Sequence, residues 1–199
     1  GLLHLGRASV LENVGLYTDR TTGLPLIPGT ALKGVLSTWS CWESAGDALF
    51  AERPQIETTR RDLARRIFGD NSDSGSDQAG DIVFVGGIPE TPPEMGLDIV
   101  NPHHEANGDP KTNLTPNVFL CLEPGTTWRF VFFARPGAAE ATTLLDTTAR
   151  WLGECLTQTG IGAKTAAGYG RFREQTAAER QASEAAEVKA SEQARSAAV

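Results

Sequence analysis

Hydrophobic and polar positions along the chain follow patterns that predict both helices and strands. An apolar stripe at helical spacing follows the turn-forming stretch DRTTGLPLIPG, and Thr30 is placed to cap the helix that begins there. The stretches TTRRDLARRIFG and AAEATTLLDTTARWLGECLTQTG are also amphipathic with helical spacing. We therefore predict three helices in the body of the chain. The first stripe consists of Leu32, Val35, Leu36 and Trp39.

Other stretches read as strands. LLHLGRASVLENVGLYT begins with alternating apolar residues, and GDIVFVGGI is almost continuously apolar. NVFLCLEPGTTWRFVFFARPG reads as two strands joined by a Pro-Gly turn, and GYGRF reads as a last strand. Between them, the stretch from Pro89 to Pro116 is dense in proline, glycine and asparagine, which predicts a long irregular loop of the kind that is usually functional.

The predicted order is β-α-α-β, a long loop, then β-β-α-β. This order is close to a split β-α-β unit, so we expect an α+β, ferredoxin-like (RRM-like) fold with long loop insertions. One domain is expected over residues 1–173. Residues 174–199 are rich in Ala and Glu without an aromatic residue, and we expect a solvated helix or a disordered tail there. The fold plan alone does not decide the function.

Composition narrows the class of function. The 199 residues carry a net charge of −7 and a pI of about 5, which argues against a stand-alone nucleic-acid binder but permits a local basic groove. No apolar run approaches the ~18 residues of a membrane span, so we expect a cytoplasmic protein. Cys41, Cys121 and Cys155 are scattered, which predicts three core thiols and neither a zinc site nor a disulfide framework. We expect no metal and no cofactor.

The stretch GIGAKTAAGYGRF, residues 160–172, is the first candidate site. It is not a phosphate-binding Walker loop, because Ala163 and Gln158 stand where glycines are required and the loop follows a helix. A dinucleotide fingerprint also fails, since Thr165 stands where its third glycine should be. Two interpretations remain open. The backbone approaches an RNA phosphate beside Lys164 and Arg171, or the glycines satisfy positive φ in a tight connection.

A second stretch bears on that choice. GLPLIPGTALKGVL resembles the first-helix signature of the RAMP superfamily, the repeat-associated RNA-binding proteins of CRISPR effector complexes. The glycine-rich loop resembles the loop near the C-terminus of these proteins. The segments DIVNPHH and GDPKTNLTPNVFLCLEPGTTWRF are similar to the sixth-subunit family of the type III-B (Cmr) effector complex. The resemblance covers roughly residues 5 to 173, which is nearly all of the expected domain.

The resemblance implies a non-catalytic subunit that caps the backbone filament near the 3′ end of the guide RNA. The implied partners are the guide RNA, a target single-stranded RNA, the neighbouring backbone RAMP subunit and the small subunit. An alternative within the superfamily is an endoribonuclease that cleaves the target or processes the guide. A third hypothesis is an unrelated protein-binding module with a ferredoxin-like core.

Residue chemistry suggests which side chains would contact RNA. Lys33 lies in the first turn of a helix, where free N–H groups favour a phosphate, although any exposed helix position accepts a lysine. His103 and His104 lie in the irregular loop and suit stacking or phosphate contact. The candidate RNA-binding residues are Arg7, Gly29, Thr30, Lys33, His103, His104, Gly160, Gly162, Lys164, Thr165, Tyr169 and Arg171. The arginines of the second helix form either a solvated face or a contact surface.

The resemblance also bears on catalysis. Target-cleaving members of the superfamily use an aspartate in the loop before the I-P-G element, where this chain has Asp19. We expect Asp19 to be structural and Asn13, a neutral amide, to lie closer to the cleaving position. Guide-processing members use an N-terminal histidine, but His4 lies inside an apolar strand and is expected to be an ordinary strand residue. We therefore expect no enzymatic activity.

Overall fold

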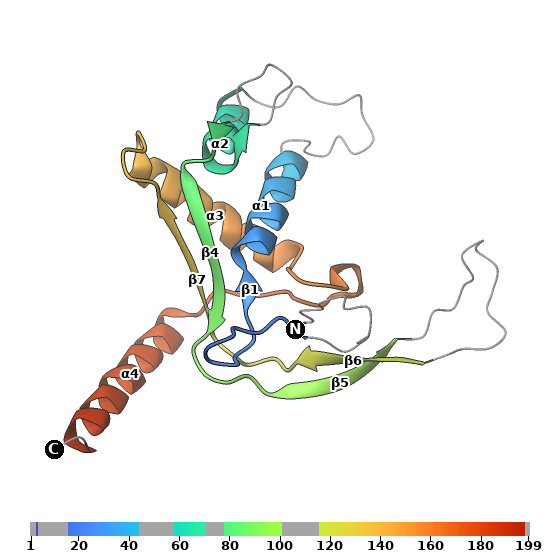
Figure 1. The fold of residues 1–199 in the computed structure, drawn as a ribbon, viewed down its shortest axis with the longest axis vertical. Coiled ribbons are helices and arrows are strands. Elements are labelled where there is room, and N and C mark those ends of the chain that lie inside the picture. The colour runs from blue at the N-terminus through green and yellow to red at the C-terminus, as the bar shows by residue number, and fades with distance from the viewer. Residues whose placement is uncertain (1–2, 4–15, 44–57, 71–77, 101–115, 198–199) are drawn as a thin grey trace.

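A computed structural model describes the fold for Leu3 and for residues 16–43, 58–70, 78–100 and 116–197 (Figure 1). Helices and antiparallel strands follow one another along these residues, which confirms the predicted α+β class. None of the helices in this part of the chain is long and apolar enough to cross a membrane.

The central sheet has three antiparallel strands in the order β1-β4-β7. These strands span Ile27–Pro28 (β1), Ile82–Pro89 (β4) and Trp128–Ala134 (β7). The register shifts between Phe84 and Gly86, so β4 carries one extra residue at that point. Phe84 and Gly87 consequently face the same side of the sheet, where Gly87 lies opposite the ring of Phe130.

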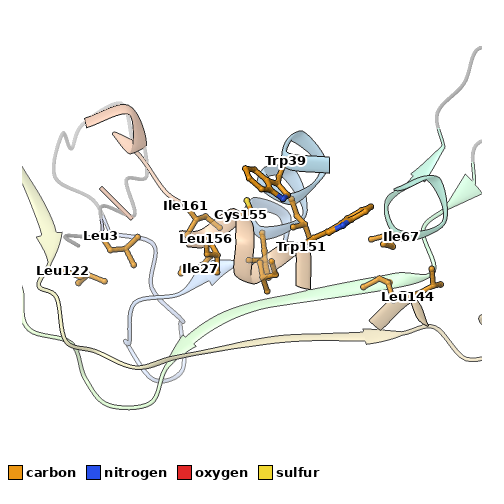
Figure 2. Close-up of a cluster of buried hydrophobic side chains, with 14 residues drawn as sticks. Leu3, Ile27, Trp39, Ile67, Leu122, Leu144, Trp151, Cys155, Leu156 and Ile161 are labelled. Carbon is orange, nitrogen blue, oxygen red and sulfur yellow. The ribbon is translucent and has the colours of Figure 1, made fainter. Parts of the chain in front are cut away.

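Two helices, α1 (Gly29–Glu43) and α3 (Ala141–Gln158), pack on one face of this sheet (Figures 1 and 2). Most of the predicted α1 stripe is buried, and in α3 the side chain of Trp151 is only 1% exposed. Ala149 of α3 is exposed, because Thr148 occupies the buried position beside it. The core cluster around these helices includes Ile27, Leu32, Leu36, Trp39, Leu144, Leu152, Cys155, Leu156 and Ile161.

The predicted second helix is present as α2 (Thr58–Phe68), and Ile67 is fully buried against the core. A two-stranded ribbon, β2 (Gly69–Asp70) with β3 (Gln78–Ala79), follows it. The prediction of three core thiols is wrong for Cys41. It is exposed because its helical position lies away from the buried stripe of α1, whereas Cys121 and Cys155 are buried.

The expected irregular loop contains a strand, which corrects the sequence interpretation. β5 (Met95–Val100) pairs antiparallel with β6 (Asn117–Leu122) to form a separate two-stranded sheet, the β5–β6 hairpin. The two strands predicted on either side of the Pro-Gly turn are present as β6 and β7, but they belong to different sheets. Residues 101–115, which join β5 to β6, lie outside the described residues.

The predicted last strand is also wrong. GYGRF forms turns and extended coil, because Gly168 and Gly170 have φ values of +91° and +71°, far from the values of an extended strand. Phe172 still packs inward, edge-on to the rings of Trp128 and Phe130. In the tail, helix α4 spans Ala177–Ala197 and points away from the body (Figure 1).

Most of the predicted first strand lies outside the described residues, as do Arg7, His4 and Asn13. Within it, Leu3 is buried and exchanges two backbone hydrogen bonds with Leu122, so Leu3 pairs with β6.

Candidate nucleic-acid interface

The I-P-G element owes its glycine to a close approach of two backbones. Pro28 ends β1 and α1 begins at once at Gly29, one residue before the N-cap expected at Thr30. A Cβ atom on Gly29 would lie 1.9 Å from the carbonyl oxygen of Phe84 in β4. The glycine therefore lets the first turn of α1 rest directly on the sheet. Thr30, in that first turn, is exposed to solvent.

The glycine loop, residues 160–170, is closed on itself at its base. The N–H of Ile161 donates to the carbonyl oxygen of Gly170 at 2.9 Å. Gly160 and Gly170 both have positive φ, and a Cβ on Gly170 would lie 1.8 Å from the carbonyl oxygen of Ile161. These two glycines therefore serve the close approach of the loop's own ends, which is the structural alternative considered for this motif.

The α1 start and the glycine loop face each other across a groove of about 510 Å³, within the usual range for ligand sites. The helix side of the groove presents Ala31, Val35 and Thr38, and Tyr17 lies at its wall. Ile161, also in the lining, packs beside Leu156 and Cys155 (Figure 2). None of the lining side chains in the described residues is charged. The lining consists of Tyr17, Pro28, Ala31, Gly34, Val35, Thr38, Trp39, Thr159, Gly160, Ile161, Gly162, Ala163 and Thr165.

The groove brings together only part of the predicted site. Gly160, Gly162 and Thr165 line it, whereas Gly29 is not part of the lining and lies against the backbone of Phe84 in β4. Lys33 is exposed. Because it comes two residues after Ala31 in α1, its side chain points to the side of the helix opposite the groove-lining positions. Arg171 is exposed at the end of the loop. Arg7, His103 and His104 lie outside the described residues.

Lys164 faces away from the groove and toward the β5–β6 hairpin. Its backbone has φ +62°, a left-handed conformation that is uncommon for lysine. Its ammonium lies 4.5 Å from the centre of the Phe119 ring, within cation–π range. The predicted phosphate-binding lysine thus already has an intramolecular partner.

Tyr169 makes the second contact between the loop and the hairpin. Its hydroxyl donates a short hydrogen bond to Oδ2 of Asp98, and its ring packs edge-on to Phe119 at 5.6 Å between centroids. This hydrogen bond raises the pKa of Tyr169 to about 12 and lowers the pKa of Asp98. The N–H of Ile99 also donates to Oδ1 of Asp98 at 2.7 Å, which fixes the carboxylate.

Sequence reasoning named Tyr169 but missed Asp98 and Phe119. Asp98 lies in the alternating stretch MGLDIV, which is a strand signal, but that alternation predicts that the apolar residues rather than Asp98 face inward. Tyr17, which lines the groove, was also missed, since it lay at the end of a predicted strand.

Three of the four arginines of α2 make contacts within the protein. The Arg60 guanidinium lies 4.8 Å above the Trp151 ring, and burial, followed by repulsion from Arg150, lowers its pKa. Arg65 pairs with Asp70. Arg66 pairs with Asp81 and Glu140. Arg61 is exposed.

Asp19 organises a turn ahead of the I-P-G element. Its Oδ1 accepts hydrogen bonds from the N–H groups of Thr21 and Thr22 and from the Thr22 hydroxyl, at 2.9–3.0 Å. The Thr22 N–H first, then its hydroxyl and the Thr21 N–H, hold the pKa of Asp19 below its ordinary value. Each bond belongs to a local turn, so the contacts of this carboxylate are structural.

A metal site or a reactive thiol would give the described part of the chain a chemistry of its own. No group of three or more His, Cys, Asp or Glu residues there is placed to hold a metal ion. Burial raises the pKa of the Cys121 and Cys155 thiols, which keeps them in the less reactive protonated form.

The protein is thus an α+β protein in which the I-P-G helix start and the glycine loop line the same groove. Residues 3–173 match the RAMP superfamily, and the chain belongs to that superfamily. This match confirms the resemblance read from the two motifs and the predicted ferredoxin-like RAMP fold. No curated protein matches the sequence.

Solved structures share the fold. Cmr6 from Pyrococcus furiosus aligns with a TM-score of 0.51 and 22% identity, covering 87% of this chain and 93% of Cmr6. A chain in a structure of the type III-B Cmr-beta complex bound to cognate target RNA aligns with a TM-score of 0.56 and 20% identity. That alignment covers 81% of this chain and 49% of the other. At these identities the similarity establishes the fold.

Proposed function

We propose that the chain is a non-catalytic RNA-binding subunit of a type III-B CRISPR effector complex, capping the backbone filament near the 3′ end of the guide RNA. Its partners are the guide RNA, a target single-stranded RNA, the neighbouring backbone RAMP subunit and the small subunit. The observation that carries the proposal is the groove in which the I-P-G helix start and the glycine loop, far apart in the sequence, meet.

The chemistry of the groove favours the base and ribose of a nucleotide over its phosphate. Its lining is apolar, with hydroxyl groups from Tyr17, Thr38, Thr159 and Thr165. Tyr17 is 39% exposed, so its ring is available for stacking, and the threonine hydroxyls suit a ribose 2′-OH. Single-stranded RNA is commonly bound through unstacked bases in this way.

The phosphates then lie outside the groove, because no charged side chain of the described residues lines it. With a net charge of −7, the isolated chain is repelled by RNA overall, so its own binding is weak and strongly salt-dependent. An assembled complex supplies the remaining positive field and the orientation of the guide.

The role of Asp19 supports a non-cleaving subunit over the endoribonuclease alternative. Its carboxylate is the acceptor that holds the turn before β1. A carboxylate committed to three local hydrogen bonds is a poor candidate for proton transfer to a substrate.

The proposal is tested by photocrosslinking RNA to the protein purified with its native neighbours. Thr38→Trp fills the groove from α1, and Thr143→Trp adds the same side chain at an exposed position of α3 outside it. We expect crosslinks in the 3′ part of the guide RNA, reduced at least about tenfold by Thr38→Trp, equivalent to about 1.4 kcal/mol, and unchanged by Thr143→Trp.

Equal crosslinking in Thr38→Trp and wild type would contradict RNA binding in the groove. RNA cleavage at defined positions would favour the endoribonuclease alternative. Absence of guide RNA from the purified assembly would favour a protein-binding module.

A further inference from the structure

The glycine loop contacts two different parts of the protein, one on each of its sides. One side, with Gly162 and Thr165, lines the groove opposite α1. On the other side, Lys164 and Tyr169 reach the β5–β6 hairpin. Within the loop, the N–H groups of Ala167 and Tyr169 donate to the carbonyl oxygen of Lys164, so the residues on both sides belong to one compact turn.

On the hairpin, Asp98 and Phe119 are directly opposite one another across β5 and β6. The loop therefore contacts both strands at this one cross-strand pair. Tyr169 bonds to Asp98 and packs against Phe119, and Lys164 lies over the Phe119 ring. Phe119 is only 2% exposed, so it is a fixed surface for the two loop side chains. The carboxylate of Asp98 is fixed in turn by the N–H of Ile99.

We propose that Asp98, Phe119, Lys164 and Tyr169 form a latch that ties the groove-lining loop to the β5–β6 hairpin, with Tyr169 and Asp98 as positioning residues for the RNA groove. This inference rests on the proposed RNA-binding function. The backbone closure at Gly160 and Gly170 fixes only the base of the loop. The latch fixes its far part, so that Gly162 and Thr165 keep their place in the groove wall. RNA in the groove and the orientation of the hairpin are thereby linked.

Tyr169→Phe tests the latch, because it removes one hydroxyl and keeps the ring against Phe119. Asp98→Asn keeps the size of the side chain but has only one acceptor oxygen for the two donors, the Tyr169 hydroxyl and the Ile99 N–H, whereas Asp98→Ala removes both acceptors. Thr157→Val is the control, since it deletes a hydroxyl whose bond runs within α3 to Gly153. Two quantities are measured: amide hydrogen exchange of β5, β6 and the loop in the full chain, and affinity for a thiouridine-labelled oligouridylate in the reconstituted complex.

We expect Tyr169→Phe and Asp98→Ala to speed exchange in the hairpin and loop and to weaken oligouridylate binding about three- to tenfold, because a hydrogen bond to a charged group is lost. Asp98→Asn is expected to fall between Asp98→Ala and wild type, because it loses the charge and one of the two acceptor oxygens. Asp98→Ala is expected to add little in the Tyr169→Phe background, since the two residues act through one bond. Thr157→Val should match wild type in both measurements.

Two results would overturn the inference. Unchanged hairpin exchange in Tyr169→Phe would mean that there is no latch. Faster exchange with wild-type affinity would mean that the contact does not position the groove. Failure of the proposed function has a different signature, because wild type itself would then fail to bind the oligouridylate, whatever the exchange of the variants.

Discussion

Gly170 offers the sharpest test of why the loop is rich in glycine. In Gly170→Ala, the new Cβ would lie 1.8 Å from the carbonyl oxygen of Ile161, whereas real Cβ contacts are essentially never shorter than 3.0 Å. The ends of the loop must therefore separate by at least 1.2 Å, the difference between these two distances. That movement breaks the hydrogen bond from Ile161 to Gly170, now 2.9 Å long.

The cost has two parts. Alanine at φ +71° costs about 1 kcal/mol in a left-handed conformation. The lost hydrogen bond and the displaced backbone add about 2 kcal/mol or more, so Gly170→Ala should lower the free energy of unfolding by about 3 kcal/mol. Gly168 is the matched control, because it has φ +91° in the same loop with nothing within 4 Å of an added Cβ. Gly168→Ala should cost only about 1 kcal/mol.

The assay is urea unfolding followed by tryptophan fluorescence, with the free energy of unfolding compared among wild type and the two variants. A gap of about 2 kcal/mol between the variants is expected from the close approach alone. Equal destabilisation by the two substitutions would refute the reasoning, since it would leave left-handed strain as the whole effect.

Two further predictions concern titration. In Tyr17→Phe, which leaves Tyr169 as the single tyrosine, ultraviolet absorbance should report a pKa of about 12, and Asp98→Ala should lower it. Because the pKa of Tyr169 is higher in the folded protein, the stability from this hydrogen bond is complete below about pH 10 and is lost as the pH rises toward 12. A Tyr169 pKa that stays at 10 would contradict the latch. Carbon NMR should report a Glu179 pKa of about 2, lowered first by Arg173, so its stabilisation is complete above about pH 4.5 and is lost as the pH falls toward 2. Arg173→Gln should raise that pKa, and no change would argue against the pair.

Periodicity predicted the helices and the main strand because burial follows local spacing. Leu32 and Leu36 are fully buried in α1, and β4 corresponds to the continuous apolar run. β5 was missed because prolines on both sides obscured the alternation of Met95, Leu97 and Ile99, which are now exposed on one face. GYGRF was assigned as a strand because sequence does not report that Gly168 and Gly170 take positive φ.

The candidate site was predictable only as far as its motifs are local. The I-P-G helix start and the glycine loop could be recognised separately, and the structure brings them to one groove. The positions of the charged side chains near these motifs could not be predicted from local sequence. The direction of Lys164 depends on Phe119 in a distant strand, and the pairing of Asp98 with Tyr169 spans 71 residues.

Helix α4 is bonded to the body of the protein near its beginning. Arg173 forms two bonds with Glu179, Gln175 bonds to Thr127 just before β7, and Ser183 bonds to Glu90 just after β4. From this base its 21 residues extend about 30 Å, clear of the body (Figure 1). Such a geometry acts as a lever: a tilt of about 10° at the base displaces the far end by about 5 Å. A small movement at the end of the sheet would thus become a larger displacement at the far end of α4.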